Sequence, residues 1–269
     1  MTSEASRGTP LSRGSGLGLG LGVLWLSIIV LLPLAAVVVK STERGWSGFW
    51  SALQNPSTAA AIRLTVGEAL LVTVVNVVMG TVVAWVLVRD DFPGKKLLDL
   101  IIDVPFALPT IVAGLVLLSL YGPDSPVNLH FANTRVGIFI ALLFVTIPFV
   151  VRAVQPVLIE MDRDVEEAAA SLGASRFTIF RRVVFPNLIP AIAAGTALAF
   201  ARAVSEYGSL VLLSGNLPFK TEVAAVRILS LNENDNPQGA AAVATVLLLV
   251  SVITLLLIDF LRRRAVRRG

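Results

Sequence analysis

Two residues of opposite charge, Arg202 and Glu206, stand four positions apart in a stretch that is otherwise strongly apolar. Residues at this spacing share one face of an α-helix, and unpaired charge inside a bilayer is costly, so we expect the two side chains to pair. A paired arginine is also a weak binding site for an anion, because the neighbouring carboxylate prevents the arginine from holding the anion too tightly. The pair is therefore interpreted either as a structural ion pair or as part of an anion path.

The remaining residue types exclude most catalytic chemistry. The chain has no cysteine, which excludes structural disulfides, thiolate nucleophiles, iron–sulfur clusters and Cys-ligated zinc. Its single histidine, His130, cannot form a histidine-based metal site and is expected in an exposed loop. Gly94-Lys95-Lys96 lacks the upstream glycine and the hydroxyl residue of a phosphate-binding loop. We therefore expect no catalytic residue, no metal site and no cofactor in this chain, and it is not predicted to be an enzyme.

The composition indicates an integral membrane protein. Of 269 residues, 55% are hydrophobic and only 15% are charged, and the mean hydropathy is +0.82. A soluble domain would carry about a quarter charged residues. The apolar residues come in blocks of about twenty, the length at which a helix crosses a bilayer. The net charge of +4 does not indicate a nucleic-acid partner, because five arginines gather in the tail after Asp259, beside an apolar block.

Six membrane-spanning helices are predicted from the hydropathy. We expect an all-α, polytopic membrane protein with a short segment at 1–16, a transmembrane domain at 17–260 and a basic tail at 261–269. Prolines inside several spans favour bent helices, which suit a transporter core better than a simple anchor. The spans are expected at about 17–39, 63–88, 101–121, 136–151, 187–213 and 239–260.

The distribution of basic residues predicts the orientation. With the N-terminus inside, the inner segments hold fifteen Lys and Arg residues and the outer segments hold five. The positive-inside rule then places both termini in the cytoplasm. A cleaved signal peptide is an alternative for the first span, since two arginines precede it and Ala35-Ala36 lie near its end. Its uncharged run of 23 residues favours a retained span.

The inner segment at 152–186 is long and amphipathic. Five acidic residues come first and suit the start of a helix, where the dipole favours negative charge. Gly173 is predicted to end that helix, because glycine accepts the left-handed conformation common there. A second short helix is expected after it, closed by Pro186 and Pro190. Apolar residues share one face of each helix: Val165, Ala168, Ala169 and Leu172 in the first, and Phe177, Phe180 and Val184 in the second.

Two interpretations of this segment can be compared by composition. An amphipathic helix lying on the membrane would carry basic residues and bulky apolar ones. The first half of the segment is instead acidic and rich in alanine, which favours a helix that docks against another protein. We expect its alanines to let a partner surface approach closely.

The same segment resembles the EAA loop of ABC-importer permeases. EAA at 167–169, Gly173 after three residues and VVFP at 183–186 after nine more follow the family pattern, with valine and phenylalanine replacing isoleucine and leucine. In that family the loop is a coupling helix that docks on a cytoplasmic ATPase. The resemblance implies the type I importer permease (MetI-like) fold, with a five-helix core plus an N-terminal helix. The residues that it assigns to ATPase coupling are Glu167, Ala168, Ala169, Gly173, Phe177 and Pro186.

Three further stretches, at 92–115, 147–158 and 200–223, resemble sulfate/thiosulfate permeases, and nearly the whole chain is similar to their T-type subunit. The resemblance implies alternating access in the inner (plasma) membrane. It implies a heterodimer with a W-type permease subunit, two copies of an ATPase that uses ATP and Mg, and an extracytoplasmic sulfate-binding protein. Ser205 departs from the family, which more often has glycine there, and this puts local helix packing in doubt.

Asn216, Lys220 and Thr221 follow the expected fifth span on its outer side. They form either an ordinary polar loop or part of an outer gate that contacts the binding protein. Together with Arg202 and Glu206 they make up the candidate translocation path.

Two other functions remain open. A molybdate or tungstate permease would share the architecture, although such permeases are usually shorter and lack the first span. A self-sufficient secondary transporter or channel would not need the docking segment at 152–186. Co-purification with an ATPase would separate these classes.

Overall fold

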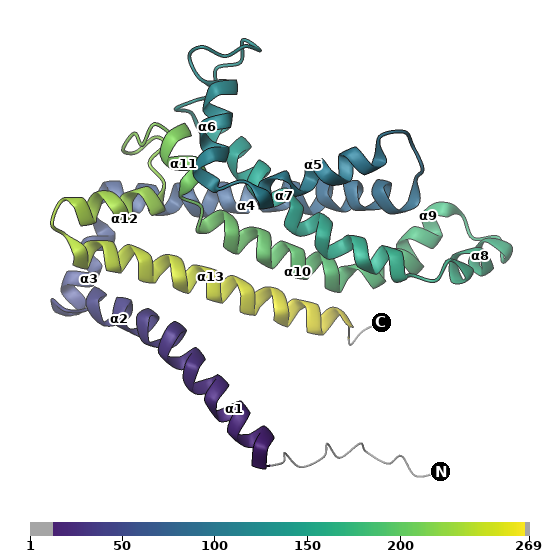
Figure 1. Cartoon of the computed structure of the whole chain (residues 1–269), viewed down its shortest axis with the longest axis horizontal. Helices are drawn as coiled ribbons and strands as arrows, with labels where there is room; N and C mark the ends of the chain where they lie inside the picture. Colours follow the sequence, from purple (N-terminus) through teal and green to yellow (C-terminus); the bar gives the residue numbers. More distant parts are fainter. Residues whose placement is uncertain (1–12, 267–269) are drawn as a thin grey trace.

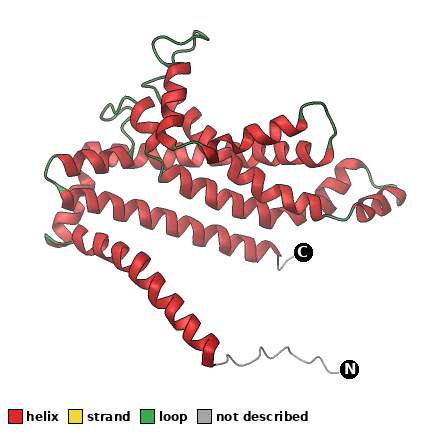
Figure 2. Cartoon of the chain, viewed as in Figure 1, coloured by secondary structure: helices red, strands yellow, loops and turns green. Residues whose placement is uncertain are grey.

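The computed structural model describes residues 13–266, and within that range the chain consists of helices and loops (Figures 1 and 2). The parts of the expected terminal segments at 1–12 and 267–269 lie outside the described residues. In chain order the helices are α1 (Arg13–Leu26), the π-helical η1 (Ser27–Leu31), α2 (Leu32–Ser41), α3 (Gly45–Gln54), α4 (Pro56–Arg89), α5 (Lys95–Ala107), α6 (Thr110–Tyr121), α7 (Arg135–Glu160), α8 (Arg163–Ser171), α9 (Arg176–Ile179), the π-helical η2 (Phe180–Val184), α10 (Phe185–Val204), α11 (Gly208–Leu213), α12 (Ala224–Glu233) and α13 (Pro237–Val266).

Five helices in the described range are long and apolar enough to cross a membrane. α5 and α6 also pass this test together, but the chain bends by 116° between them. The number of crossings is therefore six where this bent pair counts as one. The five helices are Gly16–Ser41, Pro56–Arg89, Arg135–Glu160, Arg176–Val204 and Pro237–Arg264.

The expected third span at 101–121 is divided between the second half of α5 and α6, and the bend between them agrees with the expectation that prolines bend the spans. Leu108 adopts an extended backbone conformation between α5 and α6. The residue before a proline is disfavoured in the helical region, and Pro109 itself has no N–H to donate to the preceding turn. Hydropathy continues across the break, so the position of the break is marked by the proline and not by the apolar pattern.

The expected fifth span at 187–213 is wrong at both ends. Its helix begins at Arg176, runs through η2 and ends at Val204. After a break the chain resumes as α11, which starts at Gly208. A side chain at Gly208 would collide with Thr110 of α6, so glycine is required where α11 crosses α6. The break turns the chain away from the axis of α10 to make this crossing.

The centre of the bundle is formed by α4, α7 and α10, which lie side by side (Figure 1). A side chain in place of Gly80 on α4 or Gly195 on α10 would collide with Val150 on α7. Small residues of this kind let membrane helices pack closely. The amide Nδ2 of Asn76 on α4 donates a hydrogen bond of 2.7 Å to Oγ1 of Thr146 on α7. Such a bond adds about 0.6 kcal/mol within a membrane bundle.

Two clusters of buried apolar side chains fill this bundle. One joins Val72, Leu142 and Phe200 of the three central helices. The other, which we call the inner core cluster, contains Val154 and Leu188 and extends to the end of the bundle that carries α8 and α9. By contrast, the most apolar part of α1–α2 is not buried within the chain, and α2 packs on α13.

Candidate functional site

The predicted docking segment forms a lobe at one end of the bundle, away from α3 and α12 (Figure 1). We call residues 162–179 the α8–α9 lobe. Asp162 caps α8, because its Oδ1 accepts a hydrogen bond of 2.9 Å from the backbone N–H of Asp164. Asp164 and Glu166 lie in the first turn, where the helix dipole stabilises negative charge. The expected acidic start of the first helix is therefore present.

Gly173 ends this helix in the way that the sequence predicts. Its φ is +84°, in the left-handed region that disfavours side chains. The N–H of Gly173 donates to the carbonyl of Ala170 at 2.9 Å, and the N–H of Ala174 donates to the carbonyl of Ala169 at 3.1 Å. This is a Schellman arrangement, which satisfies carbonyls that the helix end would leave free.

The second helix of the segment differs from the prediction. It is not closed by Pro186 and Pro190, because α9 continues through η2 into α10. Pro186 lies at the start of α10, and the π-helical turn before it changes the hydrogen-bond register where the proline N–H is missing. Asn187 donates from Nδ2 to the carbonyl of Val183 at 2.7 Å. The lobe is thus attached directly to a membrane helix.

Much of the apolar face of the lobe is uncovered. Val165, Leu172 and Phe177 are 54%, 89% and 70% exposed. Glu167, Ala168, Gly173 and Pro186 are exposed as well. Ala169 differs, because it is half-buried and packs against the inner core cluster. Most of the residues predicted for coupling therefore lie on an accessible surface, and Ala169 supports that surface from below.

An arginine that sequence reasoning placed only among the loop charges, Arg152 of α7, is the centre of a polar cluster. Its Nη1 pairs with Oδ1 of Asp99 at 2.6 Å, and its Nη2 pairs with Oδ2 of Asp103 at 2.7 Å. Both aspartates lie on α5, four positions apart. This spacing of two acids, together with an arginine at the end of an apolar span, was the signal for the cluster. It fastens α5 to α7 near the bend.

A second ion pair that the sequence did not reveal joins Arg89 of α4 to Glu166 of α8. The guanidinium also lies over the ring of Trp85, with Cζ 5.5 Å from the ring centroid. The pair links the α8–α9 lobe to the end of a central membrane helix.

The side chains of Arg202 and Glu206 do pair, with Nη2 2.8 Å from Oε2. They do not share a helix face as expected, because α10 ends at Val204. The Glu206 side chain is only 1% exposed, and its Oε1 accepts hydrogen bonds of 2.8 Å from both the backbone N–H and the Oγ–H of Ser209. The carboxylate therefore holds Arg202 and the first turn of α11 together.

Asn216, Lys220 and Thr221 lie in the loop between α11 and α12. The amide Nδ2 of Asn216 donates to the carbonyl of Val211 at 3.0 Å, and Oγ1 of Thr221 accepts from the N–H of Leu217 at 3.2 Å. These bonds shape the loop itself. In the described part of the chain, no hydrogen bond or ion pair joins the three residues to Arg202 or Glu206.

Glu222, at the end of this loop, is a buried carboxyl that sequence reasoning missed. Its side chain is 5% exposed, and Oε1 lies 3.7 Å from Nη1 of Arg227. Burial raises the pKa of the Glu222 carboxyl above its ordinary value, and the guanidinium of Arg227 opposes that rise. Arg227 in turn donates from Nε to Oγ1 of Thr58 on α4 at 3.3 Å. The loop is therefore held against the start of α4.

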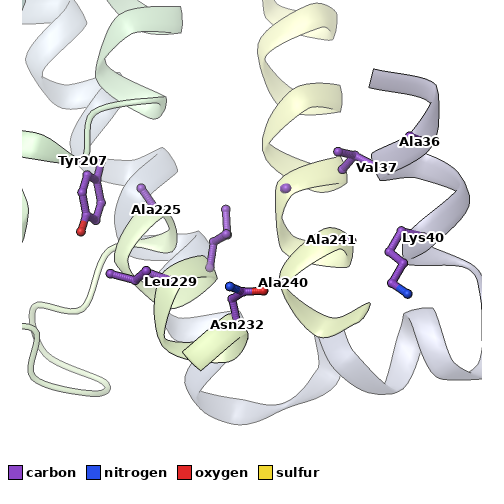
Figure 3. A pocket seen from close by; sticks show the side chains of 11 residues that line it. Ala36, Val37, Lys40, Tyr207, Ala225, Leu229, Asn232, Ala240 and Ala241 are labelled. Atoms are coloured by element: carbon purple, nitrogen blue, oxygen red, sulfur yellow. The ribbon is translucent and has the colours of Figure 1, made fainter. Parts of the chain in front are cut away.

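A hollow of about 670 Å³ lies between α2, α12 and α13 (Figure 3). Its lining includes Val37, Leu229 and Ala241 and is largely apolar. The amine of Lys40, on its α2 side, is paired with Glu43 at 2.7 Å. A divalent anion would be costly to hold against such walls, so this hollow does not suit the anion path.

The comparisons with known proteins agree with this architecture. The model of the family described as "Binding-protein-dependent transport system inner membrane component" matches residues 76–267. The sulfate transport system permease protein CysT of Synechocystis sp. is 47% identical over 248 residues, covering 90% of this chain and 87% of the relative. The protein of the same name from Escherichia coli is 42% identical over 269 residues, covering 97% and 95%.

Solved structures show the fold. A bacterial ABC transporter involved in the import of alginate superposes with a TM-score of 0.78 at 16% identity, covering 93% of this chain and 94% of that chain. The MetNI methionine ABC transporter gives a TM-score of 0.55 at 19% identity, covering 77% and 94%. At these identities the likeness concerns the fold alone, which is that of a MetI-like ABC-importer permease. From its sequence relatives, the chain belongs to the binding-protein-dependent transport system inner membrane components, and among them to the family of the sulfate transport system permease proteins CysT.

Proposed function

We propose that this chain is the T-type permease subunit of an ATP-driven importer for sulfate and thiosulfate. The observation that carries the proposal is its identity of 42–47% to sulfate transport system permease proteins over most of both chains. The chain combines a membrane bundle, a bent helix pair and an uncovered lobe. These features suit a subunit that opens and closes a path for the anion, driven by ATP hydrolysis in a partner protein. The anion would cross by alternating access.

The α8–α9 lobe is the proposed docking site of the ATPase. Its exposed apolar side chains, above all Leu172 and Phe177, offer a surface that a partner would cover, and an exposed patch of this kind marks an interaction site. Glu167 and Ala168 would lie at the contact, Gly173 would set the shape of the lobe, and Pro186 would begin the helix that carries movement into the membrane. ATP and Mg belong to the partner, which would be present in two copies.

The remaining partners follow from the family. A W-type permease subunit would supply the other half of the path, and an extracytoplasmic sulfate-binding protein would deliver the anion. Arg202, paired with Glu206, is the proposed weak binding site for the anion, and the loop with Asn216, Lys220 and Thr221 is the proposed outer gate. Both termini would be cytoplasmic, from the excess of basic residues in the inner segments. A reporter enzyme that is active only outside the membrane and is fused after Gly269 should then be silent.

The proposal can be tested in cells. The chain would be expressed with its partner permease, its ATPase and its binding protein in a bacterium that lacks sulfate uptake. We expect uptake of labelled sulfate, loss of that uptake when any one component is left out, and recovery of the ATPase with a tagged form of this chain. Uptake of molybdate without sulfate would favour the molybdate permease, and sulfate uptake without the ATPase would favour a secondary transporter.

A further inference from the structure

We propose that Arg89, at the end of α4, is a positioning residue that ties α8 to the membrane helices through Glu166, so that movement of α8 reaches α4 directly. This inference rests on the proposed function, in which α8 docks on an ATPase, and it adds a route for transmitting movement within this chain. The backbone joins α8 only to α7 and α9. Glu166 lies 77 positions after Arg89, so the contact to α4 is made by folding and not by chain continuity.

The pair adds a direct side-chain contact between α8 and α4, which the backbone does not join. Nη2 of Arg89 forms an ion pair with Oε1 of Glu166, and the side chains of Arg89 and Glu166 are 10% and 21% exposed. Among the described residues, no other side-chain hydrogen bond or ion pair connects α8 to α4, α7 or α10. Apolar support is small, because Val165 and Leu172 of the α8 region are more than half exposed, and the residues of this region that pack on the inner core cluster are the small Ala169 and Ala174. We therefore expect this pair to contribute to the position and tilt of α8, together with the backbone connections to α7 and α9.

Each charge stands at the helix end that favours it. Arg89 is in the last turn of α4, where the dipole stabilises a cation, and Glu166 is in the first turn of α8, where it stabilises an anion. The two dipoles thus reinforce the attraction between the side chains. Reversing both charges would keep the attraction but oppose both dipoles, so a reversed pair should restore the link only in part.

The guanidinium of Arg89 is also held in place by aromatic rings. Its Cζ lies 5.5 Å from the centroid of Trp85, one turn earlier on α4. Trp85 in turn meets Phe180 of η2 edge to face, with centroids 5.5 Å apart at 79°. Trp85 therefore holds the guanidinium of Arg89 in place and itself packs against η2, which leads from the lobe into α10. Glu166 thus pairs with a cation whose position is already fixed.

α4 carries contacts at both of its ends. It has 34 residues, which corresponds to about 50 Å of helix. Near its start, Oγ1 of Thr58 accepts from Arg227, and Oγ1 of Thr65 accepts from the N–H of Ala224 at 2.7 Å. Both donors lie in the first turn of α12, directly after the loop between α11 and α12 that is the proposed outer gate. Through Arg89, α8 is thus connected to a helix whose far end contacts α12, the helix that follows the proposed gate loop.

The first measurement tests the link without relying on transport. Because the chain has no cysteine, Asp90→Cys and Arg163→Cys place one spin label at the end of α4 and one at the start of α8. We expect a narrow distance distribution in the otherwise unchanged chain. Arg89→Gln and Glu166→Gln should each broaden it. Arg263→Gln removes a partner of Asp259 from the exposed surface of α13 and should leave it unchanged.

The second measurement tests transmission in the complete reconstituted complex, as sulfate transported per ATP hydrolysed. We expect this ratio to fall by about fivefold or more in Arg89→Gln and in Glu166→Gln, the range of a typical coupling between two sites, with the ATPase still bound. The double variant should be no worse than either single variant. The charge reversal Arg89→Glu with Glu166→Arg should recover part of the loss, whereas each reversal alone should not.

An unchanged distance distribution in Arg89→Gln, an unchanged transport ratio, or losses that simply add in the double variant would overturn the proposal. If Arg89→Gln does not assemble, Glu166→Gln on the lobe surface carries the same test. Failure of the ATPase to bind the wild-type complex would instead overturn the docking role of α8. The spin-label distances separate that result from the absence of the Arg89–Glu166 link.

Discussion

Arg202 and Glu206 form an ion pair of 2.8 Å across the end of α10, although Glu206 lies beyond the last helical residue. The buried carboxylate uses its second oxygen to hold the first turn of α11 through Ser209. Arg202 remains 32% exposed at its side chain. The pair is therefore anchored on the side of the glutamate and accessible on the side of the arginine, as we would expect if Arg202 contacts the anion in the proposed path.

Variants of this pair separate its two roles. Glu206→Gln keeps an oxygen that accepts from Ser209 but leaves Arg202 uncompensated, so we expect normal assembly and slow release of the anion. Arg202→Ala leaves a buried carboxylate without its cation, a change that typically costs about 3–5 kcal/mol, and should lower the yield of the complex.

The double change of Arg202 and Glu206 to Gln completes this test. If Arg202 attracts the anion, the double variant should assemble well and transport slowly. Transport better than that of either single variant would mean that the pair is purely structural. Uptake of labelled sulfate and the yield of the complex measure both properties, and wild-type uptake in all three variants would remove the pair from the path.

A substitution at Gly173 tests the shape of the α8–α9 lobe. Valine has room there, since no atom lies within 4 Å of an added Cβ, but its φ of +84° would strain a β-branched residue by about 1–3 kcal/mol. We expect Gly173→Val to insert into the membrane and to recover less ATPase in a pull-down. Gly173→Asn should recover more, because asparagine tolerates this conformation. Gly67→Val, at an equally open glycine in α4, is the control.

Phe177 tests the exposed apolar surface of the lobe. Its side chain is 70% exposed, so Phe177→Ser should change the free energy of unfolding by no more than about 0.5 kcal/mol. If Phe177 anchors the ATPase, affinity should fall by about tenfold or more. Val127→Ser, at a 51% exposed residue in the loop after α6, should leave the affinity unchanged. Equal binding by both variants would contradict the docking surface.

The buried carboxyl of Glu222 should make the free energy of unfolding depend on pH. Burial raises the pKa of its carboxyl above the ordinary 4.5, so the folded protein favours the protonated form. This contribution to stability is fully present below the ordinary pKa and is lost as the pH rises through the raised pKa of the folded state. The difference in Tm between Glu222→Gln and wild type should therefore increase as the pH rises through that range. A difference that is independent of pH would contradict the assignment.

The sequence allowed local features of the lobe to be predicted, because they depend on neighbouring residues. The acidic first turn of α8 and its end at Gly173 follow from capping and glycine conformation. The prolines inside the spans predicted bent helices, and the break between α5 and α6 at Pro109 agrees with this. The end of α10 at Val204 was not predicted, since hydropathy is continuous across it. Contacts between distant segments, such as Arg89 with Glu166, leave no periodic pattern and appear only in the folded chain.

The role of this chain in sulfate import is tested most directly by ATP-driven uptake of labelled sulfate into liposomes that contain this chain, its partner permease and two ATPase subunits, with the binding protein outside. We expect uptake that needs both ATP and the binding protein and that is suppressed by excess unlabelled thiosulfate. Sulfate uptake that continues without ATP, or a complex that is active in transport of molybdate and inactive with sulfate, would contradict this role.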